Sequence, residues 1–263
     1  MNIVVGDTSQ LAYFFPDNFI KISSRNINIG NQNFDTVYLT FAEQRTFNKN
    51  LSESDFIEIN VNYTTKVINE LLDKSKKIII YGTAELWNNH DGAIDINSKI
   101  DYKYSFYVKS KELLYEKLLE NRQKSLWHNV FIIHPFNFNS LKRKEGFLFH
   151  KIYDSLINNK INNVGYLDIN RDIIHTSFLA KQSLICNEDC LVGSGKLTNI
   201  KNFITNLFGK FNKHYEDFLI EDKNAFSFHK GNEFYLKSNI IYNNLLNDTI
   251  YEINQLHEAY KIS

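Results

Sequence analysis

A tyrosine and a lysine four residues apart, Tyr107 and Lys111, form the pair in this sequence whose chemistry is easiest to foresee. Their spacing puts both side chains on one face of a helix. An ammonium beside a phenol favours the phenolate and lowers the pKa of the tyrosine towards neutrality. Thr83 ends a strand-like segment upstream, and its hydroxyl can hold a substrate oxygen against the phenol. Together they predict a general acid/base for interconverting a carbonyl and an alcohol, with a hydride moving alongside the proton.

The same pair also has a simpler interpretation. The chain holds 15 tyrosines and is rich in lysine, so one pair at this spacing is expected by chance. Tyr107 is then a partly buried residue of an amphipathic helix whose lysines are solvated. The order of the surrounding segments has to decide between the two interpretations.

The bulk composition describes a globular chain without a polyanionic partner. At 263 residues with 43% hydrophobic and 14% aromatic content, it can form one large domain, or a domain with a small lobe. Thirty basic and thirty acidic residues cancel, and no basic stripe alternates with aromatics, so no nucleic-acid partner is expected. The short basic runs at 74–77 and 141–144 are interpreted as solvated loop charges.

Cysteine usage and the N-terminal segment point to a reducing compartment. Cys186 and Cys190 form no disulfide framework, and without a histidine cluster nearby no metal site is predicted. The N-terminal segment lacks a basic start and a long apolar run, and no stretch approaches a membrane span. We therefore expect a cytoplasmic protein with no membrane partner.

Apolar runs and helical patterns alternate along the chain. Strands are expected at 2–6, 18–23, 34–42, 76–82 and 129–136, and helices at 8–15, 55–74, 102–122 and 147–160. Later segments predict a strand and helix at 165–185, a strand, turn and helix at 191–211, and a helix from 240 onwards. This alternation predicts an α/β fold, a parallel sheet with helices on both faces. Gly6, Thr40, Thr83 and His134 would stand at carboxyl ends of strands, where such sheets bind ligands.

From residue 1 to about 210, the order of segments resembles the extended short-chain dehydrogenase/reductases, in particular their nucleotide-sugar-modifying branch. GDTSQLA (6–12) resembles the glycine-rich phosphate turn, with Ser9 replacing the second glycine and Ala12 the third. FDTVYLTFA (34–42) and INVNYTTKVINEL (59–71) resemble the next conserved strand and helix of the family, with Asn60 at the helix's asparagine. YGTAELW (81–87) puts Thr83 at the catalytic Ser/Thr, and Tyr107 and Lys111 match the YxxxK pair 24 residues beyond it.

Three later segments continue the resemblance. IIHPFNFNS (132–140) resembles LRPFNVYGP, with His134 replacing an arginine and Asn137 at an asparagine that faces the nucleotide sugar. INRDIIHTSFLAKQSL (169–184) resembles RDFIHVDDVA, where Arg171 would meet a substrate phosphate. LVGSGKLTNIKNF (191–203) resembles a structural turn and helix.

The resemblance implies a Rossmann-type doubly wound parallel sheet with a small C-terminal substrate-binding lobe. Residues 1–145 would form the NADP(H)-binding domain with the Thr/Tyr/Lys set. Residues 146–263 would form mainly the substrate lobe, with segments returning to the first domain. The sequence departs from the family in its two lost glycines and in a short connection between the second and third strands, which predicts a missing helix or strand.

The second strand ends in KISSRN (21–26), where NAD-type members carry an acid. Ser23, Ser24 and Arg25 suit the 2′-phosphate of NADP instead, unless Arg25 is only a solvent-facing loop residue. We therefore expect NADPH/NADP+ in preference to NAD(H). The expected cofactor-binding residues are Gly6, Thr8, Ser9, Gln10, Leu11, Ser23, Ser24, Arg25, Thr40, Phe41, Ala42, Tyr107, Lys111 and His134.

The resemblance also limits the reaction. Dehydratases of the family carry an Asp-Glu pair after the catalytic threonine, whereas Ala84 and Glu85 stand here, which disfavours 4,6-dehydration. The implied activity is a 4-keto reduction of a nucleotide sugar in surface polysaccharide biosynthesis, catalysed by Thr83, Tyr107 and Lys111. The expected substrate-binding residues are Thr83, Glu85, Asn137, His150 and Arg171.

Several alternatives stay open at this point. An NAD-dependent nucleotide-sugar 4-epimerase uses the same catalytic residues, and the eroded glycine turn also suits a non-catalytic Rossmann-type scaffold or sensor. His150 is either an acid/base or a helix-packing residue, and His175 is interpreted as structural. Members of the family commonly dimerise through two helices, one of which bears the tyrosine, so a homodimer is expected. Four leucines of this helix would contribute to the dimer contact or to the core: Leu113, Leu114, Leu118 and Leu119.

Overall fold

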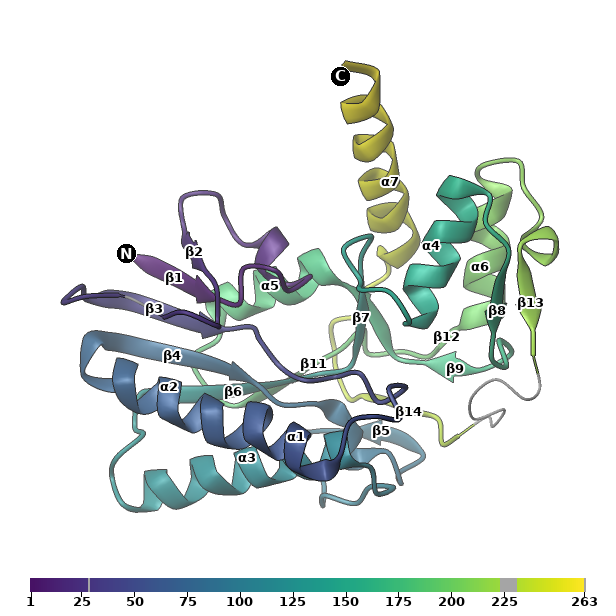
Figure 1. The fold of residues 1–263 in the computed structure, drawn as a ribbon. Coiled ribbons are helices and arrows are strands. Elements are labelled where there is room, and N and C mark those ends of the chain that lie inside the picture. Colours follow the sequence, from purple (N-terminus) through teal and green to yellow (C-terminus); the bar gives the residue numbers. More distant parts are fainter. Residues whose placement is uncertain (28, 223–230, 263) are drawn as a thin grey trace.

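The computed structural model describes residues 1–27, 29–222 and 231–262, and its centre is a sheet of six parallel strands (Figure 1). The strand order is β11-β6-β4-β3-β1-β2. Their bounds are β1 Asn2–Val5, β2 Ile20–Ile22, β3 Phe34–Leu39, β4 Ser75–Tyr81, β6 Val130–Pro135 and β11 Cys190–Val192. From β1 the chain runs outward to β2 and then crosses back to β3, so the winding reverses beside β1. In open α/β sheets ligands bind outside the carboxyl ends of the strands at such a reversal.

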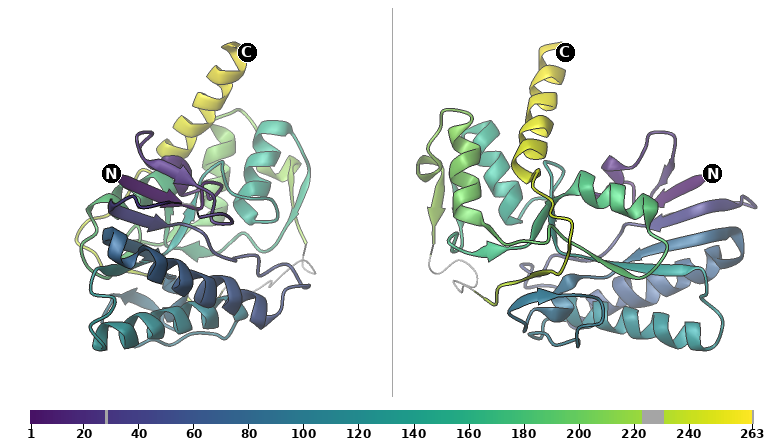
Figure 2. Two further views of the ribbon diagram at one scale, coloured as in Figure 1. Left: turned by 60° about the vertical axis from the view of Figure 1, so that its left-hand side comes forward. Right: turned by 180° about the vertical axis from the view of Figure 1, so that it is seen from behind.

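Helices cover both faces of the sheet, which confirms the expected doubly wound architecture (Figures 1 and 2). Successive residues of β4 alternate between two cores because strand side chains point to opposite faces: Ile78 and Ile80 join one core and Ile79 the other. The first core packs against α2 (Thr64–Leu71) and α3 (Phe106–Gln123). The second packs against α5 (Thr176–Ile185) and the helices of a second lobe.

The crossover from β1 to β2 contains no α-helix. The helix expected at 8–15 is reduced to one 3₁₀ turn, η1 (Ala12–Phe14). Aromatic residues pack on the sheet in its place, with the ring of Phe15 centred 4.5 Å and that of Phe19 6.0 Å from Tyr38. The described residues between β2 and β3 also contain no helix, as the short connection in the sequence predicted.

The helix expected at 55–74 is present but is not uniform. It begins as α1 (Glu53–Ile57), widens into a π-helical turn η2 (Glu58–Tyr63), continues as α2 and ends in the 3₁₀ turn η3 (Leu72–Lys74). Such π-turns are frequent at functional sites. This one contains Asn60, whose side chain is buried.

The remaining elements build the second lobe and its connections. The lobe carries α4 (Leu148–Asn158), α6 (Ile200–Gly209), β8 (Asn162–Val164), β9 (Asn170–Arg171), β12 (Thr198–Asn199), η5 (Tyr215–Asp217) and β13 (Leu219–Glu221). Short strand pairs connect it to the sheet: β7 (Asn137–Asn139) with β10 (Ile173–His175), and β5 (Gly92–Ile94) with β14 (Phe234–Leu236).

The chain ends in α7 (Leu245–Ile262), which projects from the body (Figure 1). No helix within the described part of the chain is long and apolar enough to cross a membrane.

Candidate active site

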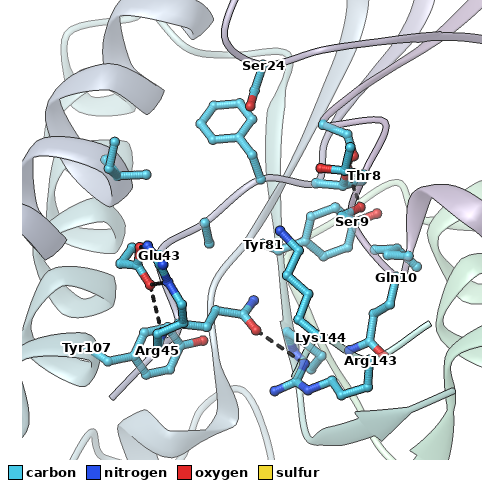
Figure 3. A pocket seen from close by; sticks show the side chains of 18 of the residues that line it. Thr8, Ser9, Gln10, Ser24, Glu43, Arg45, Tyr81, Tyr107, Arg143 and Lys144 are labelled. Carbon is cyan, nitrogen blue, oxygen red and sulfur yellow. Dashed lines mark hydrogen bonds and ion pairs between the residues drawn. The ribbon is translucent and has the colours of Figure 1, made fainter. Parts of the chain in front are cut away.

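Two adjoining cavities lie at the carboxyl ends of the parallel strands. The first, of about 600 Å³, is lined by the turn after β1, the segment after β3 and the loop before α4 (Figure 3). The second, of about 730 Å³, extends towards the second lobe. The wall between them is shared by Gln44, Tyr107, Pro135, Phe138, Arg143 and Phe147. A group held in one cavity can therefore contact a group held in the other beside Tyr107.

The structure brings Thr83 and Tyr107 together at this wall. Thr83 is buried at the end of β4, where its hydroxyl accepts a hydrogen bond from the Glu85 amide (3.3 Å) and begins the 3₁₀ turn η4 (Ala84–Trp87). Ser105 caps α3 by accepting from the Val108 amide (3.2 Å), which places Tyr107 in the first helical turn. Both side chains line the second cavity, and the interaction with the Thr83 side chain acts to lower the pKa of the Tyr107 phenol. A phenol and an alcohol thus converge on one point, as a carbonyl oxygen requires.

The protonation of the Tyr107–Lys111 pair corrects the sequence-based expectation. Burial raises the pKa of Tyr107 to about 12, and the bond from Thr83 only partly opposes this. Burial also lowers the pKa of Lys111 to about 7. Its Nζ donates to the Tyr81 carbonyl (2.7 Å) and lies 6.0 Å from the centre of the Tyr107 ring. The expected drop of the tyrosine pKa towards neutrality is therefore wrong, because burial of the phenol dominates and the amine is bonded to the Tyr81 carbonyl.

A buried amide network fixes the backbone around Tyr107. The Asn60 side chain accepts from the Glu43 amide (2.8 Å) and donates to the Glu43 carbonyl (3.0 Å) and to Ser110 Oγ (2.9 Å). Ser110 in turn donates to the Tyr107 carbonyl (2.7 Å). The π-turn of the preceding helix therefore ties the segment after β3 to the first turn of α3.

The turn after β1 begins with a glycine, and side chains from the turn and from the end of β3 pack against it. Gly6 has φ +107°, and a Cβ there would lie 2.9 Å from Thr40 Oγ1, so the position requires glycine. Ser9 Oγ donates to Thr40 Oγ1 (2.8 Å) and accepts from the Ala12 amide (3.0 Å). The hydroxyl proton of Ser9 is therefore donated within the protein, whereas the sequence predicted that Ser9 would contact the cofactor.

Gln10 supplies an observation that fits a bound dinucleotide. Its Oε1 accepts from Ser140 Oγ (3.2 Å) and Thr176 Oγ1 (3.4 Å), while its buried Nε2 has no hydrogen-bond partner. A buried unpaired donor is costly unless a ligand satisfies it. Other expected cofactor residues also line the first cavity: Thr8, Leu11, Thr40, Phe41, Ala42, Ser24 and Arg25. Ser23 does not line this cavity, and its hydroxyl accepts a hydrogen bond from the Arg25 amide (3.2 Å).

The expected roles of His134 and His150 need correction. His134 is fully buried between Trp87 and Tyr115 and lines neither cavity. Its Nδ1 accepts from the Thr83 amide (3.3 Å), and burial lowers its pKa to about 4, so it is neutral and supports the strand end from behind. His150 lies on α4 and also lines neither cavity, which agrees with the helix-packing alternative.

The other expected substrate residues line the second cavity. Glu85 accepts from Asn88 Nδ2 (2.9 Å), and Asn137 donates to the Asp172 carbonyl (3.4 Å). Arg171 Nη1 donates to the Asn170 carbonyl (2.8 Å) at the lobe side of the same cavity. The arrangement combines a carboxylate, an amide and a guanidinium around a space that opens onto Tyr107.

Loop 142–144, which the sequence pattern indicated to be solvated charge, also belongs to the site. Lys142, Arg143 and Lys144 all line the first cavity, and Arg143 also lines the second. The Arg143 guanidinium stacks 3.7 Å from the centre of the Phe147 ring, and burial lowers its pKa to about 10. The signal that could have found them is their position directly after a strand-end segment already assigned to the site.

Comparisons with known proteins agree with this fold. Neither a protein-family model nor a curated protein matches the sequence. MoeE5 in complex with UDP-glucose and NAD matches over 98% of this chain and 99% of its own, with a TM-score of 0.78 at 9% identity. UDP-glucuronic acid 4-epimerase from Bacillus cereus in complex with NAD matches over 97% and 99%, with a TM-score of 0.73 at 16% identity. RMD from Pseudomonas aeruginosa complexed with NADPH matches over 94% and 91%, with a TM-score of 0.69 at 14% identity. The chain therefore shares the fold of these three structures over nearly its whole length.

Proposed function

We propose that the protein is an NADP(H)-dependent oxidoreductase that reduces the 4-keto group of a nucleotide sugar in surface polysaccharide biosynthesis. The observation that carries this proposal is the placement of Thr83 and Tyr107 together on the lining of the second cavity, with Tyr107 also lining the first. Residues 1–145 hold the dinucleotide, and residues 146–263 mainly hold the sugar. A solved structure of the same fold in complex with both UDP-glucose and NAD supports a site for a dinucleotide beside a nucleotide sugar.

The protonation states of the site suit reduction. NADPH, when bound, supplies the hydride. With a pKa of about 12, Tyr107 holds its proton at neutral pH and donates it to the substrate oxygen as that oxygen gains charge. Thr83 orients the oxygen, and Lys111, fixed on the Tyr81 carbonyl, is assigned to the nicotinamide ribose. General acid catalysis of this kind contributes roughly 10²–10⁴-fold to the rate.

The preference for NADP(H) is supported by the composition of the first cavity. Ser24 and Arg25 line the end of it next to β2. Among the described residues that line it, the only carboxylate is that of Glu43, which pairs with Arg45. A 2′-phosphate placed there meets a guanidinium and no acid.

The proposal is tested by assaying Tyr107→Phe with a 4-keto nucleotide sugar, following NADPH absorbance. Turnover should fall by about 10² or more, with NADPH affinity unchanged, because only the proton donor is removed. Near-full activity of this variant would refute the assignment of the acid. Binding of NADPH and NADH is measured in parallel to test the cofactor preference.

A nucleotide-sugar 4-epimerase is the second candidate, because two of the solved structures with this fold are 4-epimerases. An epimerase returns its cofactor to the starting state in each cycle. NAD retained through purification, with interconversion of sugars and no net NADPH use, would favour it over the reductase. A scaffold or sensor would bind the dinucleotide without either activity.

We also propose a homodimer through α3. Leu114 and Leu118 are buried in the core of the subunit, whereas Leu119 is 40% exposed and Leu113 is partly buried. Only the latter two are therefore available to a partner. The mass of the protein in solution, measured by light scattering, tests this.

A further inference from the structure

The usual anchor for a dinucleotide pyrophosphate is missing from this chain. In Rossmann folds the pyrophosphate rests on the N-terminus of the helix that follows the first strand, where backbone amides and the helix dipole favour an anion. Here that helix is the three-residue turn η1. Ser9 cannot replace it, because its hydroxyl proton is donated to Thr40. The first cavity therefore needs another source of positive charge.

The loop 142–144 lies where such a source is needed. Lys142, Arg143 and Lys144 line the first cavity together with Ser9 and Gln10. The Lys142 ammonium lies 4.0 Å from the centre of the Tyr13 ring, and Tyr13 belongs to η1. The loop therefore contacts the connection between β1 and β2. In Figure 3, Arg143 and Lys144 lie along the lower edge of the pocket, and Ser24 stands at its opposite end.

The cavity has an excess of positive charge that the described protein leaves unbalanced. Its basic lining residues are Arg25, Arg45, Lys111, Lys142, Arg143 and Lys144. Against them stands one carboxylate, Glu43, which is paired with Arg45. Within the described part of the chain, none of the three loop cations forms an ion pair. Gathered cations in a cavity favour a polyanionic ligand.

The loop is held in place by side chains from distant segments. The Leu141 amide donates to Glu252 of α7 (2.9 Å), and the Lys142 amide donates to Ser140 Oγ (3.3 Å). Ser140 also donates to Gln10, whose buried Nε2 is the unpaired donor described above. The orphan amide of Gln10 and the basic loop are therefore parts of one connected structure.

We propose that Lys142, Lys144 and the Gln10 amide hold the pyrophosphate of the dinucleotide, in place of the absent helix N-terminus. This inference rests on the proposed function, since it concerns the ligand of the same cavity. It assigns binding to side chains from a loop about 130 residues away from the turn that Rossmann folds normally use.

The test is the affinity of Lys142→Gln/Lys144→Gln for NADPH, read from quenching of the protein's tryptophan fluorescence. We expect NADPH to bind about tenfold or more weakly, with a smaller dependence on salt between about 50 and 300 mM, because two charge-assisted contacts are lost. Lys117→Gln/Lys124→Gln, at exposed positions of α3 and of its C-terminal cap, removes the same charge and should leave the affinity unchanged. Gln10→Glu should also weaken binding, since a carboxylate replaces the amide donor.

Adenosine 2′-phosphate, which lacks the pyrophosphate, separates the parts of the ligand. Its affinity should be the same in the wild type and in the Lys142/Lys144 variant. An equal loss for both ligands, or no loss for NADPH, would overturn the inference and leave the proposed function standing. Failure of the wild-type protein to bind either NADPH or NADH would instead remove the proposed function, and this inference with it.

Discussion

The buried amine of Lys111 makes a sharp prediction about stability and pH. Lys111 is 3% exposed, and burial lowers its pKa from 10.5 to about 7. Between these two values the unfolded chain binds a proton that the folded protein does not, so the stability of the ligand-free protein rises with pH across this window. Each pKa unit corresponds to 1.36 kcal/mol, so the full contribution is about 5 kcal/mol. This gain in stability is absent at pH 7 and below, and it is complete above pH 10.5.

The substitution Lys111→Met removes this titration while keeping the length of the side chain. We expect the difference in unfolding free energy between wild type and variant to change by several kcal/mol from pH 7 to pH 10, in favour of the wild type as pH rises. Urea denaturation at several pH values measures it, and Lys117→Gln on the exposed side of the same helix serves as the control. Parallel pH profiles for wild type and Lys111→Met would show that the amine is not held neutral and would refute this reasoning.

Three further predictions follow from packing and backbone geometry. Gly6→Ala should lower the free energy of unfolding by about 2 kcal/mol and weaken dinucleotide binding, because the added Cβ would contact Thr40 at a residue with positive φ. The control Gly30→Ala, also at positive φ but with open space around it, should leave dinucleotide binding unchanged. Asn60→Ala should lower the free energy of unfolding by about 1–3 kcal/mol, and it should lower kcat more than it raises KM, because the buried hydrogen-bond network behind Tyr107 is lost. An unchanged kcat would contradict a role of Asn60 in positioning Tyr107. Phe15→Ala should cost about 3–5 kcal/mol in urea denaturation, against a small loss for the exposed Phe106→Ala.

The fold could be predicted from segments with a clear strand or helix periodicity, and part of the site from the residues at the strand ends. The apolar run of β4 and the long pattern of α3 fixed the positions of Thr83 and Tyr107, and the structure brings these two side chains together. Local spacing was enough here because a strand end and a first helical turn are both set by nearby residues.

The parts that could not be predicted depend on contacts between distant segments. The sequence pattern at 8–15 allows a helix, but Phe15 and Phe19 are used instead to cover Tyr38, and only a single turn forms. The direction of the Lys111 amine depends on the Tyr81 carbonyl 30 residues away. The placement of loop 142–144 depends on Glu252, 111 residues from Leu141. No local pattern encodes these contacts.

The bond from Leu141 to Glu252 also has a consequence for the opening motions of the protein. Because Leu141 is bonded to α7 and the adjoining Ser140 to Gln10, in addition to the bonds within the loop, opening of the first cavity is coupled to these two segments. Hydrogen exchange at the Leu141 amide should therefore report detachment of α7, and a dinucleotide that settles on the loop should slow exchange in both segments together.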